Sequence, residues 1–389
     1  MKTLVSYHHF PHYRKGVFEE LFQRYSEITL ITSELGSFAG IPSMQPTGGC
    51  KLIWGRGLWF KGLHFQPRLV IESIVGEYDV YVLLANPNFI STWFAAILAR
   101  LRGKRVVFWG HGFFTNENSF KNIVRRCFFS LANCFYSYGY RSKLIAKSFG
   151  FASYNLYVGF NSLDYSRQLQ IRQQVSVDSS PGSLGVFSRS GALKIICVSR
   201  LTEICRYELL FDAIALVRNR CDLDIEVVMV GDGPSRDQLE KMAAELNINV
   251  KFLGAIYDDN LVGAMIYTAD ITVSPGKVGL TAMHSLMFGT PVISHANVVE
   301  QMPEVEAVVD KKTGLLFNQW DVYALADALI EAKSCFADKD KVRMNCYTVI
   351  DQVYNPKKQV DVLLNAINCV PADEGDDVLH LSWFEQSVK

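Results

Sequence analysis

Short apolar runs alternate with segments of helical periodicity along this chain, and they do so in two separate series. The predicted strands of the first series are Lys2–Tyr7, Ile28–Thr32, Asp79–Leu84 and Arg105–Trp109. The helices predicted in the same series are Val17–Tyr25, Phe89–Arg102 and Asn122–Ala132. Strands that alternate with helices pair in parallel and form a doubly wound sheet. The first series therefore predicts an α/β domain.

The pattern lapses between Gln168 and Gly191, where Ser, Gly and Gln predominate, as is typical of a linker. A second series follows. Its predicted strands are Lys194–Val198, Asp224–Val230, Val250–Leu253, Asp270–Val273 and Pro291–Ser294. Its predicted helices are Leu209–Arg218 and Arg236–Leu246. Two doubly wound domains are therefore expected.

The chain length of 389 residues suits two domains better than one. We expect a Rossmann-like domain over residues 1–175, a second Rossmann-like domain over residues 176–372, and an acidic tail over residues 373–389. Two such α/β domains would face each other across a cleft. Ligands of these sheets bind outside the carboxyl ends of the strands, so the residues that follow each strand are the candidate site residues.

Charge is divided unevenly along the chain, although 39 basic side chains balance 39 acidic ones. Residues 1–175 carry 20 Lys and Arg against 9 Asp and Glu, a net charge of +11. The remainder carries 39 − 20 = 19 against 39 − 9 = 30, a net charge of −11. A basic half suits an anionic partner. Because no nucleic-acid-binding motif accompanies it, a membrane or lipid phosphate is favoured over DNA or RNA.

No apolar run is long enough for a transmembrane helix, and the first residues do not resemble a signal peptide. The nine cysteines form no CxxC pair and lack a histidine at metal-ligand spacing. These features suit reduced thiols in a cytosol. We expect a cytoplasmic protein without a cofactor or metal, and its basic half suits peripheral contact with the inner face of the cell membrane.

Two segments of the first half follow predicted strands and carry candidate site residues. The loop from His8 to Gly16 places Arg14 and Lys15 beside a glycine at a helix start, where phosphate oxygens are bound well. A solvent loop with incidental charges is the alternative. His111 lies between two glycines after RVVFW and could donate to a phosphate or sugar hydroxyl, or act as an acid or base. A structural histidine is the alternative there.

Three segments of the second half also follow predicted strands. Arg200 has a planar fork suited to a diphosphate, the alternative being an ion pair with Glu203. Gly231-Asp232-Gly233 permits either close approach to a ligand or a tight strand-to-helix turn. The segment Ser274–Ile293 gives a strand, a glycine-containing loop, a helix and another strand. The amides at that helix start suit an anion, and a plain Rossmann-like turn is the alternative.

The order of these motifs resembles that of the retaining GT-B glycosyltransferases of family 4. Asn161–Asp164 looks like the family's Asn-Gly-x-Asp segment, and the first domain otherwise matches only through its opening loop and the His-Gly pair. The matching elements of the second domain are VSRLTEICRYELLFDAI, VVMVGDGPSRDQLE, VKFLGAI, ADITVSPGKVGLTAMHSLMFGTPVIS, MPEV and TGLLF.

The resemblance implies an α/β GT-B fold and a retaining, metal-independent transfer of a sugar from a UDP- or GDP-linked donor. It further implies that Arg200 binds the donor diphosphate, that His111 lies beside the transferred sugar, and that Lys15 and Gly16 lie near the donor phosphates. The loop amides that would bind the donor phosphate and sugar belong to Gly276, Lys277, Val278, Gly279 and Leu280. No carboxylate nucleophile is required, because cations and amides would stabilise the leaving diphosphate.

The chain departs from the family pattern at two places. Gly276 and His284 stand where the family usually has two glutamates eight residues apart, of which the first serves the donor sugar and the second the ribose. His284 can still bond a ribose hydroxyl, whereas Gly276 offers only its backbone. The usual Lys-Gly pair falls on Cys205-Arg206, and Arg206 is a candidate replacement for the lysine.

Aromatic and basic residues of the first half suggest an acceptor or membrane surface. One group, in a single predicted loop, is Trp54, Arg56, Trp59, Phe60 and Lys61. A second group, on one predicted helix, is Lys121, Arg125, Arg126, Phe128 and Phe129. Core packing is the alternative for the aromatic residues. Arg14 is a further candidate for the acceptor site.

Three functions fit this sequence. The leading one is a transferase that adds a sugar to a growing glycan or a lipid-diphosphate-linked saccharide. The second is a catalytically inactive protein that binds a nucleotide sugar or a partner. The third is an enzyme of different chemistry on the same fold, such as a sugar-nucleotide epimerase, because a fold does not by itself define a function.

Overall fold

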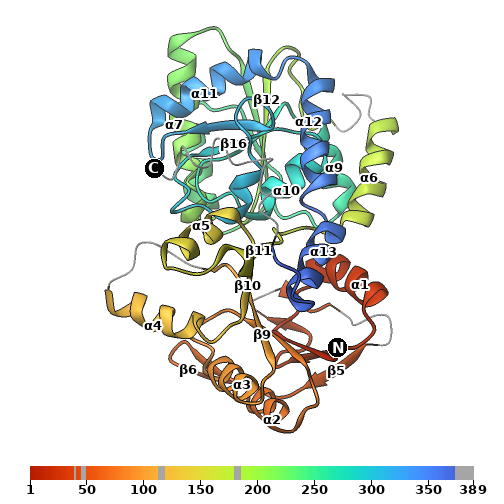
Figure 1. The fold of residues 1–389 in the computed structure, drawn as a ribbon. Coiled ribbons are helices and arrows are strands. Elements are labelled where there is room, and N and C mark those ends of the chain that lie inside the picture. The colour runs from red at the N-terminus through yellow and green to blue at the C-terminus, as the bar shows by residue number, and fades with distance from the viewer. Residues whose placement is uncertain (39–40, 45–49, 113–118, 179–184, 373–389) are drawn as a thin grey trace. The chain divides into compact units, whose positions relative to one another are not determined.

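A computed structural model describes residues 1–38, 41–44, 50–112, 119–178 and 185–372 (Figure 1). Its internal contacts divide the chain into two compact units. Among the described residues, unit 1 comprises residues 1–164 and 355–372, and unit 2 comprises residues 165–354. The predicted tail over residues 373–389 lies outside the described residues.

A parallel seven-stranded sheet forms the centre of unit 1, in the order β11-β10-β9-β8-β1-β2-β5. The strands are β1 Thr3–Ser6, β2 Ile28–Thr32, β5 Lys51–Trp54, β8 Val80–Leu84, β9 Arg105–Gly110, β10 Cys134–Ser137 and β11 Leu156–Val158. The central strands are buried on both faces, as parallel sheets covered by helices are. The predicted α/β character of this half is confirmed.

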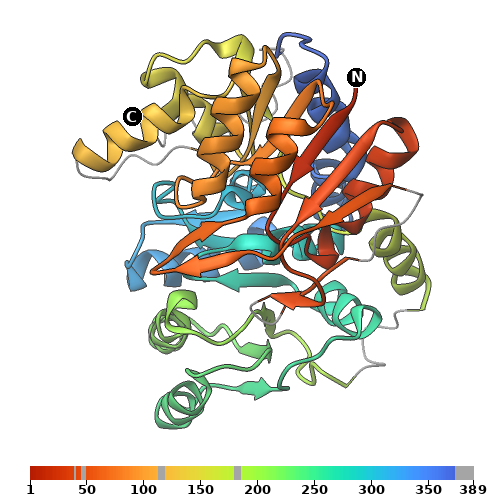
Figure 2. The same ribbon diagram turned by 90° about the horizontal axis from the view of Figure 1, so that it is seen from below.

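Helices cover both faces of this sheet (Figure 1; Figure 2). Alternate strand residues enter two cores, since Val5 and Val82 belong to one and Leu4 and Leu83 to the other. The first core includes residues of α1 and α13, and the second includes residues of α2, α3, α4 and α5. The helices are α1 Lys15–Arg24, α2 Pro67–Val75, α3 Ile90–Leu101, α4 Ser119–Phe129, α5 Tyr140–Ser148 and α13 Pro356–Ile367.

Helix α13 packs on unit 1, although residues 355–372 were expected in the second domain. Tyr136 donates its hydroxyl to the backbone oxygen of Gln359 at 2.8 Å, and Ser162 donates to the side-chain oxygen of Gln359 at 2.7 Å. Val360 and Leu363 are fully buried in the core that lies on that side of the sheet. The end of the chain therefore returns to the first unit through side chains that no local pattern identifies.

Two antiparallel hairpins extend unit 1. Strands β3 (Ser37–Phe38) and β4 (Ile41–Pro42) form one, and β6 (Leu58–Phe60) and β7 (Leu63–Phe65) form the other. The turn of the second hairpin has φ angles of 47° at Lys61 and 80° at Gly62, the positive values that two-residue hairpin turns require. The segment expected as a loop with Trp59 and Phe60 is therefore a hairpin.

Unit 2 has a parallel six-stranded sheet in the order β14-β13-β12-β15-β16-β17. Its strands are β12 Leu193–Val198, β13 Ile225–Val230, β14 Val250–Phe252, β15 Ile271–Ser274, β16 Val292–His295 and β17 Gly314–Phe317. Its helices are α6 Tyr165–Asp178, α7 Tyr207–Arg220, α8 Arg236–Glu245, α9 Asp259–Thr268, α10 Gly279–Met287, α11 Val322–Cys335 and α12 Lys339–Gln352. Asp258, Asp321 and Asp338 accept backbone N–H groups at the starts of α9, α11 and α12. The second predicted α/β domain is thus confirmed as a Rossmann-like unit.

Helix α6 occupies part of the segment that was expected to be a linker between Gln168 and Gly191. It also begins at the boundary between the units, at Tyr165 rather than near residue 175. Arg172 pairs with both carboxylate oxygens of Asp351 on α12, at 3.1 and 2.9 Å, and Ile171 is buried. The polar composition therefore belongs to a helix that is held by an ion pair and by a few buried apolar side chains.

The sheet orders place one switch point in each unit. Strand β1 lies between β2 and β8, and strand β12 lies between β13 and β15. Connections on the two sides of such a strand lead away to opposite faces, which leaves a crevice at the carboxyl ends. Within the described part of the chain, no helix has the length and apolar character needed to cross a bilayer.

Candidate functional site

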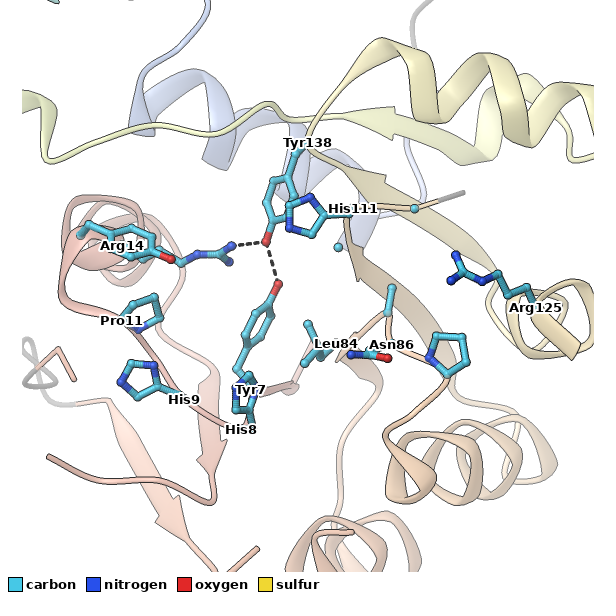
Figure 3. A pocket seen from close by; sticks show the side chains of 15 residues that line it. Tyr7, His8, His9, Pro11, Arg14, Leu84, Asn86, His111, Arg125 and Tyr138 are labelled. Atoms are coloured by element: carbon cyan, nitrogen blue, oxygen red, sulfur yellow. Dashed lines mark hydrogen bonds between the residues drawn. The ribbon is translucent and has the colours of Figure 1, made fainter. Parts of the chain in front are cut away.

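A pocket of about 470 Å³ lies at the switch point of unit 1 (Figure 3). The loops after β1, β8 and β9 form most of its wall, as expected where parallel strands end. Helix α4 adds Arg125, and the residue after β10 adds Tyr138. The described residues that line it are Tyr7, His8, His9, Pro11, Tyr13, Arg14, Leu84, Ala85, Asn86, Pro87, Gly110, His111, Gly112, Arg125 and Tyr138.

Arg14 is a buried cation of this pocket, with 8% of its surface exposed. Its guanidinium carbon lies 5.0 Å from the ring centres of Tyr7 and Tyr138 and 5.3 Å from that of Trp109. Nη2 donates to the Tyr138 hydroxyl, as the dashed line in Figure 3 shows. Cation–π contact and this hydrogen bond therefore hold the side chain in place.

The histidines of the pocket are neutral at physiological pH. Burial, followed by the charge of Arg14, lowers the pKa of His111 to about 4, although its ring remains open to the pocket. Burial and the neighbouring His64 and His9 lower the pKa of His8 to about 4. A neutral imidazole has one donor and one acceptor nitrogen, which suits sugar hydroxyls.

The structure brings together three of the predicted residues of unit 1, namely Arg14, His111 and Arg125, in this pocket. Lys15 lies on the exposed side of α1 and pairs with Glu19 at 3.5 Å. Gly16 is the second residue of α1 rather than the residue before it, and it packs against Asp164 and Pro356. The remaining predicted residues, Arg56, Trp59 and Arg126, are outside the pocket lining.

Sequence reasoning missed Tyr7, Asn86 and Tyr138 as pocket residues. Asn86 follows a strand that was predicted at Asp79–Leu84, so its position after a strand end was a usable signal. Tyr138 follows β10, which the apolar pattern alone did not separate from the helix before it. The contact between Tyr7 and Tyr138 joins residues 131 positions apart and has no local signal.

Phe128 and Phe129 do not contribute to a surface. Both are fully buried, and Phe128 stacks on Phe108 with ring centres 4.6 Å apart. The core-packing alternative is therefore correct for this pair. The aromatic residues of the other group differ, since Phe60 of the β6–β7 hairpin is 68% exposed and Trp54 at the end of β5 is 53% exposed.

Arg200 follows β12 at the switch point of unit 2 and is exposed. Among the described residues it forms no ion pair, so the alternative pairing with Glu203 is not seen. The first turn of α10 lies close to the end of β12, because Thr281 donates its hydroxyl to the Val198 carbonyl at 2.9 Å. Among the described residues, Arg200 is therefore a cation without an ion-pair partner. It follows the end of β12, which contacts the start of α10.

Gly231 and Gly233 support the loop that carries Arg200. A Cβ on Gly231 would lie 1.8 Å from the Ser199 carbonyl oxygen, and one on Gly233 would lie 2.2 Å from the Leu201 oxygen. Leu201 also donates its N–H to the Asp232 carbonyl at 3.0 Å. These glycines therefore permit close packing between two loops, which favours the tight-turn interpretation of the motif.

Gly276 lies against the backbone of the η3 turn, Glu203–Cys205. A Cβ at this position would lie 1.9 Å from the Ile204 carbonyl oxygen. The Gly276 N–H donates to the Cys205 carbonyl at 3.0 Å, and its own carbonyl accepts from Gln301 at 3.1 Å. The site therefore has no room for the family's glutamate, and both backbone groups of Gly276 already have partners.

Gln301 holds the same loop and was missed by sequence reasoning. Its Oε1 accepts the Val278 N–H at 3.0 Å, and its Nε2 donates to the Ser294 hydroxyl at 2.8 Å and the Gly276 carbonyl at 3.1 Å. The side chain is 7% exposed. Gln301 thus connects the loop after β15 to the end of β16.

The start of α10 supplies the remaining amides of the predicted donor loop. Gly279 and Leu280 are the first two residues of α10, so their N–H groups have no carbonyl partner in the preceding turn. Lys277 is exposed, whereas Val278 is fully buried. His284 lies further along the same helix, and burial lowers the pKa of its ring. An anion at this helix start would meet two amides and one cation.

A cluster of Arg206, His295 and Trp320 lies beside this loop, because Gly276 donates to the Cys205 carbonyl and Gln301 donates to the His295 carbonyl at 3.3 Å. The Arg206 guanidinium carbon is 4.8 Å from the Trp320 ring centre, and its Nε lies 2.9 Å from Glu208. The His295 ring is 5.8 Å from Trp320 and fully buried, and neither ring nitrogen has a partner among the described residues. Burial lowers the pKa of His295 to about 4. The described residues contain no group of three or more His, Cys, Asp or Glu placed to hold a metal ion.

Residues 192–334, which lie within unit 2, match the family described as Glycosyl transferases group 1. Glycogen synthase from Chlorobaculum parvum is 30% identical over 131 residues, which is 31% of this chain and 25% of that protein. Alpha-monoglucosyldiacylglycerol synthase from Streptococcus pneumoniae is 29% identical over 189 residues, which is 47% of this chain and 39% of that protein. The chain thus aligns with less than half the length of either relative.

A similar solved structure is that of Anabaena Alr3699/HepE in complex with UDP. Its TM-score is 0.66 at 17% identity, with coverage of 95% of this chain and 100% of that one. The two Rossmann-like units and these structural neighbours define the fold as GT-B, as expected. The fold is thus that of GT-B proteins, and residues 192–334 of unit 2 are similar to Glycosyl transferases group 1.

Proposed function

We propose that this protein is a retaining, metal-independent glycosyltransferase that moves a sugar from a UDP- or GDP-linked donor to a glycan or lipid-linked saccharide. The observation that carries the proposal is Arg200, an exposed cation without an ion-pair partner among the described residues, at the switch point of unit 2. The start of α10 contacts the end of the same strand. A guanidinium and helix-start amides are groups that bind a diphosphate.

In this proposal the donor diphosphate binds to Arg200, Lys277 and the amides of Gly279 and Leu280. As the bond to the sugar breaks, negative charge develops on the leaving diphosphate, and these groups stabilise it without reorganisation. The acceptor hydroxyl attacks the face that the diphosphate leaves, so the configuration at the sugar carbon is retained. The neutral His111 would bond a hydroxyl of the transferred sugar.

The proposed donor is supported by the comparisons. The similar Anabaena structure is a complex with UDP. The Streptococcus pneumoniae relative is named as a synthase of alpha-monoglucosyldiacylglycerol, which is a glycolipid. A nucleotide-sugar donor and a lipid-linked or glycan acceptor are therefore the substrates to test first.

Donor hydrolysis tests this proposal. The wild-type protein is incubated with UDP- and GDP-linked sugars in the presence of a chelator, and release of the nucleotide is measured. We expect turnover of at least one donor and a loss of about 100-fold or more in Arg200→Ala, because a charge-assisted contact contributes about 3 kcal/mol in an active site. Arg220→Ala, at a surface ion pair with Asp327, is the matched control.

A second candidate is a protein that binds a nucleotide sugar without turnover. The close contact of Gly276 with Ile204 favours it, because the glutamate that serves the donor sugar in the family cannot be accommodated there. Binding of a donor without release of nucleotide, with or without a saccharide acceptor, would support this candidate. Conversion of the sugar while still attached to its nucleotide would instead identify an epimerase.

We further propose that unit 1 contacts the inner face of the cell membrane through the hairpin β6–β7. Leu58 and Phe60 are 52% and 68% exposed there, and Arg56 and Lys61 flank them. Exposed apolar side chains with neighbouring cations suit a bilayer that contains anionic lipids. This contact would bring a lipid-linked acceptor to a cytoplasmic enzyme.

A further inference from the structure

Among the described residues, no acidic side chain compensates the buried cation of the unit 1 pocket. Arg14 lies at the end of the η1 turn, His12–Arg14, and 92% of its surface is buried (the exposed fraction is 8%). Its Nε and Nη1 are buried and have no hydrogen-bond partner among the described residues. A buried charge without a partner is strongly unfavourable, so such an arrangement in a pocket points to a ligand.

The two tyrosines beside Arg14 do not supply this charge. The Tyr138 hydroxyl accepts from Arg14 and lies 2.8 Å from the Tyr7 hydroxyl, which in turn lies 3.4 Å from the Trp109 carbonyl. These contacts form one chain of hydrogen bonds, in which Tyr138 donates to Tyr7 and Tyr7 donates to the Trp109 carbonyl oxygen. Burial raises the pKa of both phenols. The hydroxyls therefore stay protonated and leave the guanidinium charge in place.

The rest of the lining is equally poor in negative charge. The fifteen described residues that line the pocket include Arg14 and Arg125 but no Asp or Glu. Figure 3 shows His111 next to Tyr138, with the Arg14 guanidinium pointing to the same hydroxyl. Burial, followed by the charge of Arg14, lowers the pKa of His111, so this ring senses the charge of the guanidinium.

We propose that this pocket recognises its acceptor by an anionic group, a carboxylate or a phosphate monoester, which compensates the charge of Arg14. This inference rests on the proposed transferase function, because only a transferase has an acceptor. A volume of about 470 Å³ is sufficient for a charged monosaccharide unit. A neutral sugar could bond the histidines but would leave the guanidinium charge unchanged. The acceptor class is therefore a uronic acid or a sugar phosphate rather than a neutral saccharide.

The test uses the pKa of His111 as a local probe, measured by NMR of histidine-labelled protein with glucose, glucuronate, glucose 6-phosphate or UDP. An anion beside Arg14 cancels part of the field that lowers this pKa. We expect glucuronate or glucose 6-phosphate to raise it by at least one unit and to bind at least tenfold more tightly than glucose. The arm that responds distinguishes a carboxylate from a phosphate.

Two variants assign the effect to Arg14. Arg14→Met should abolish the preference for the anionic sugar, whereas Arg14→Lys, which keeps the charge, should retain most of it. Arg100→Met, on an exposed part of α3, is the matched control and should behave as the wild type. If Arg14→Met does not fold, the comparison of glucose with glucuronate and glucose 6-phosphate in the wild type and in Arg14→Lys still decides the question.

Three outcomes would overturn the inference. Glucose could bind as tightly as both anionic sugars, folded Arg14→Met could keep the preference, or UDP alone could raise the His111 pKa, which would assign the charge to the donor. None of these three outcomes depends on whether the protein transfers a sugar. If the protein hydrolyses a nucleotide sugar but shows no preference for an anionic sugar, only the inference of an anionic acceptor is overturned. If it prefers the anionic sugar but turns over no donor, only the proposed transferase function is overturned.

Discussion

The backbone N–H of Val278 donates to the side-chain oxygen of Gln301 at 3.0 Å, across 23 residues of sequence. The amide nitrogen of the same glutamine donates to the Gly276 carbonyl at 3.1 Å. One buried side chain therefore holds two peptide groups of the loop that begins α10. Because the proposed donor amides follow directly at Gly279 and Leu280, Gln301 is a positioning residue for the donor site.

Replacing Gln301 should weaken both the fold and donor binding. Gln301→Leu leaves the buried Val278 N–H without an acceptor, which costs about 2 kcal/mol of unfolding free energy. We expect a lower melting temperature and about a tenfold rise in KM for the donor, and Gln301→Glu should lie between it and the wild type because it keeps the acceptor oxygen. Gln238→Leu, at an exposed position of α8, is the control. An unchanged donor KM in Gln301→Leu would contradict the positioning role.

A side chain at Gly276 should be harmful, even the glutamate of the family pattern. The Cβ would lie 1.9 Å from the Ile204 carbonyl oxygen, so the η3 turn or the loop must move. We expect Gly276→Ala to lose about 1–3 kcal/mol of unfolding free energy, measured by denaturant titration. Gly279→Ala is the matched comparison, since its nearest neighbour, Met302, lies 4.0 Å from the added carbon. Equal stability of the two variants would show that the η3 turn moves away from the added carbon at little cost in free energy.

Stability should fall on acidification partly because of His295. Burial holds its pKa at about 4 in the native protein, whereas the unfolded chain has the usual value of 6.5. Between these two values the unfolded chain binds a proton that the native protein does not, so the free energy of unfolding falls as pH decreases, by up to about 3 kcal/mol. Above pH 6.5 this contribution is complete.

His295→Phe should reduce that dependence. The variant removes the titrating ring while keeping the volume, so the difference in unfolding free energy between pH 7 and pH 4 should shrink relative to the wild type. Urea titrations at several pH values measure it. His12→Phe, at an exposed position, should leave the dependence unchanged. A pH dependence that is the same in wild type and His295→Phe would show that the native protein does not lower the pKa of His295.

Membrane binding should depend on the tip of the β6–β7 hairpin. Phe60→Glu removes an apolar ring and adds a repulsive charge, so affinity for vesicles with anionic lipid should fall about tenfold or more in a sedimentation assay. Lys61→Glu should have a smaller effect that disappears at high salt. Tyr257→Glu, at a residue of unit 2 that is 91% exposed, is the control. Wild-type protein that does not bind such vesicles would reject the proposed contact.

The strands and the positions of most candidate site residues were predictable because they follow from short-range patterns. The strand Ile28–Thr32 was predicted with its observed bounds, and Arg200 and His111 were identified by their positions after strands. The β6–β7 hairpin and helix α6 were not predicted. Their sequences are mixed in polarity, and their conformations depend on contacts such as the pairing of Arg172 with Asp351.

The sequence by itself determined the alternation of strands and helices, the two α/β units and the glycines and cations at strand ends, because each of these depends on neighbours a few residues apart. Only the tertiary structure decided which of those residues meet. Tyr7, Arg14 and Tyr138 form one cluster over 131 residues, and α13 returns to unit 1 from the far end of the chain. The tertiary structure also determines the charges in the pocket. No carboxylate among the described pocket residues compensates Arg14, and burial keeps His111 neutral. The energy of a buried charge depends on everything packed around it, and no local pattern contains that information.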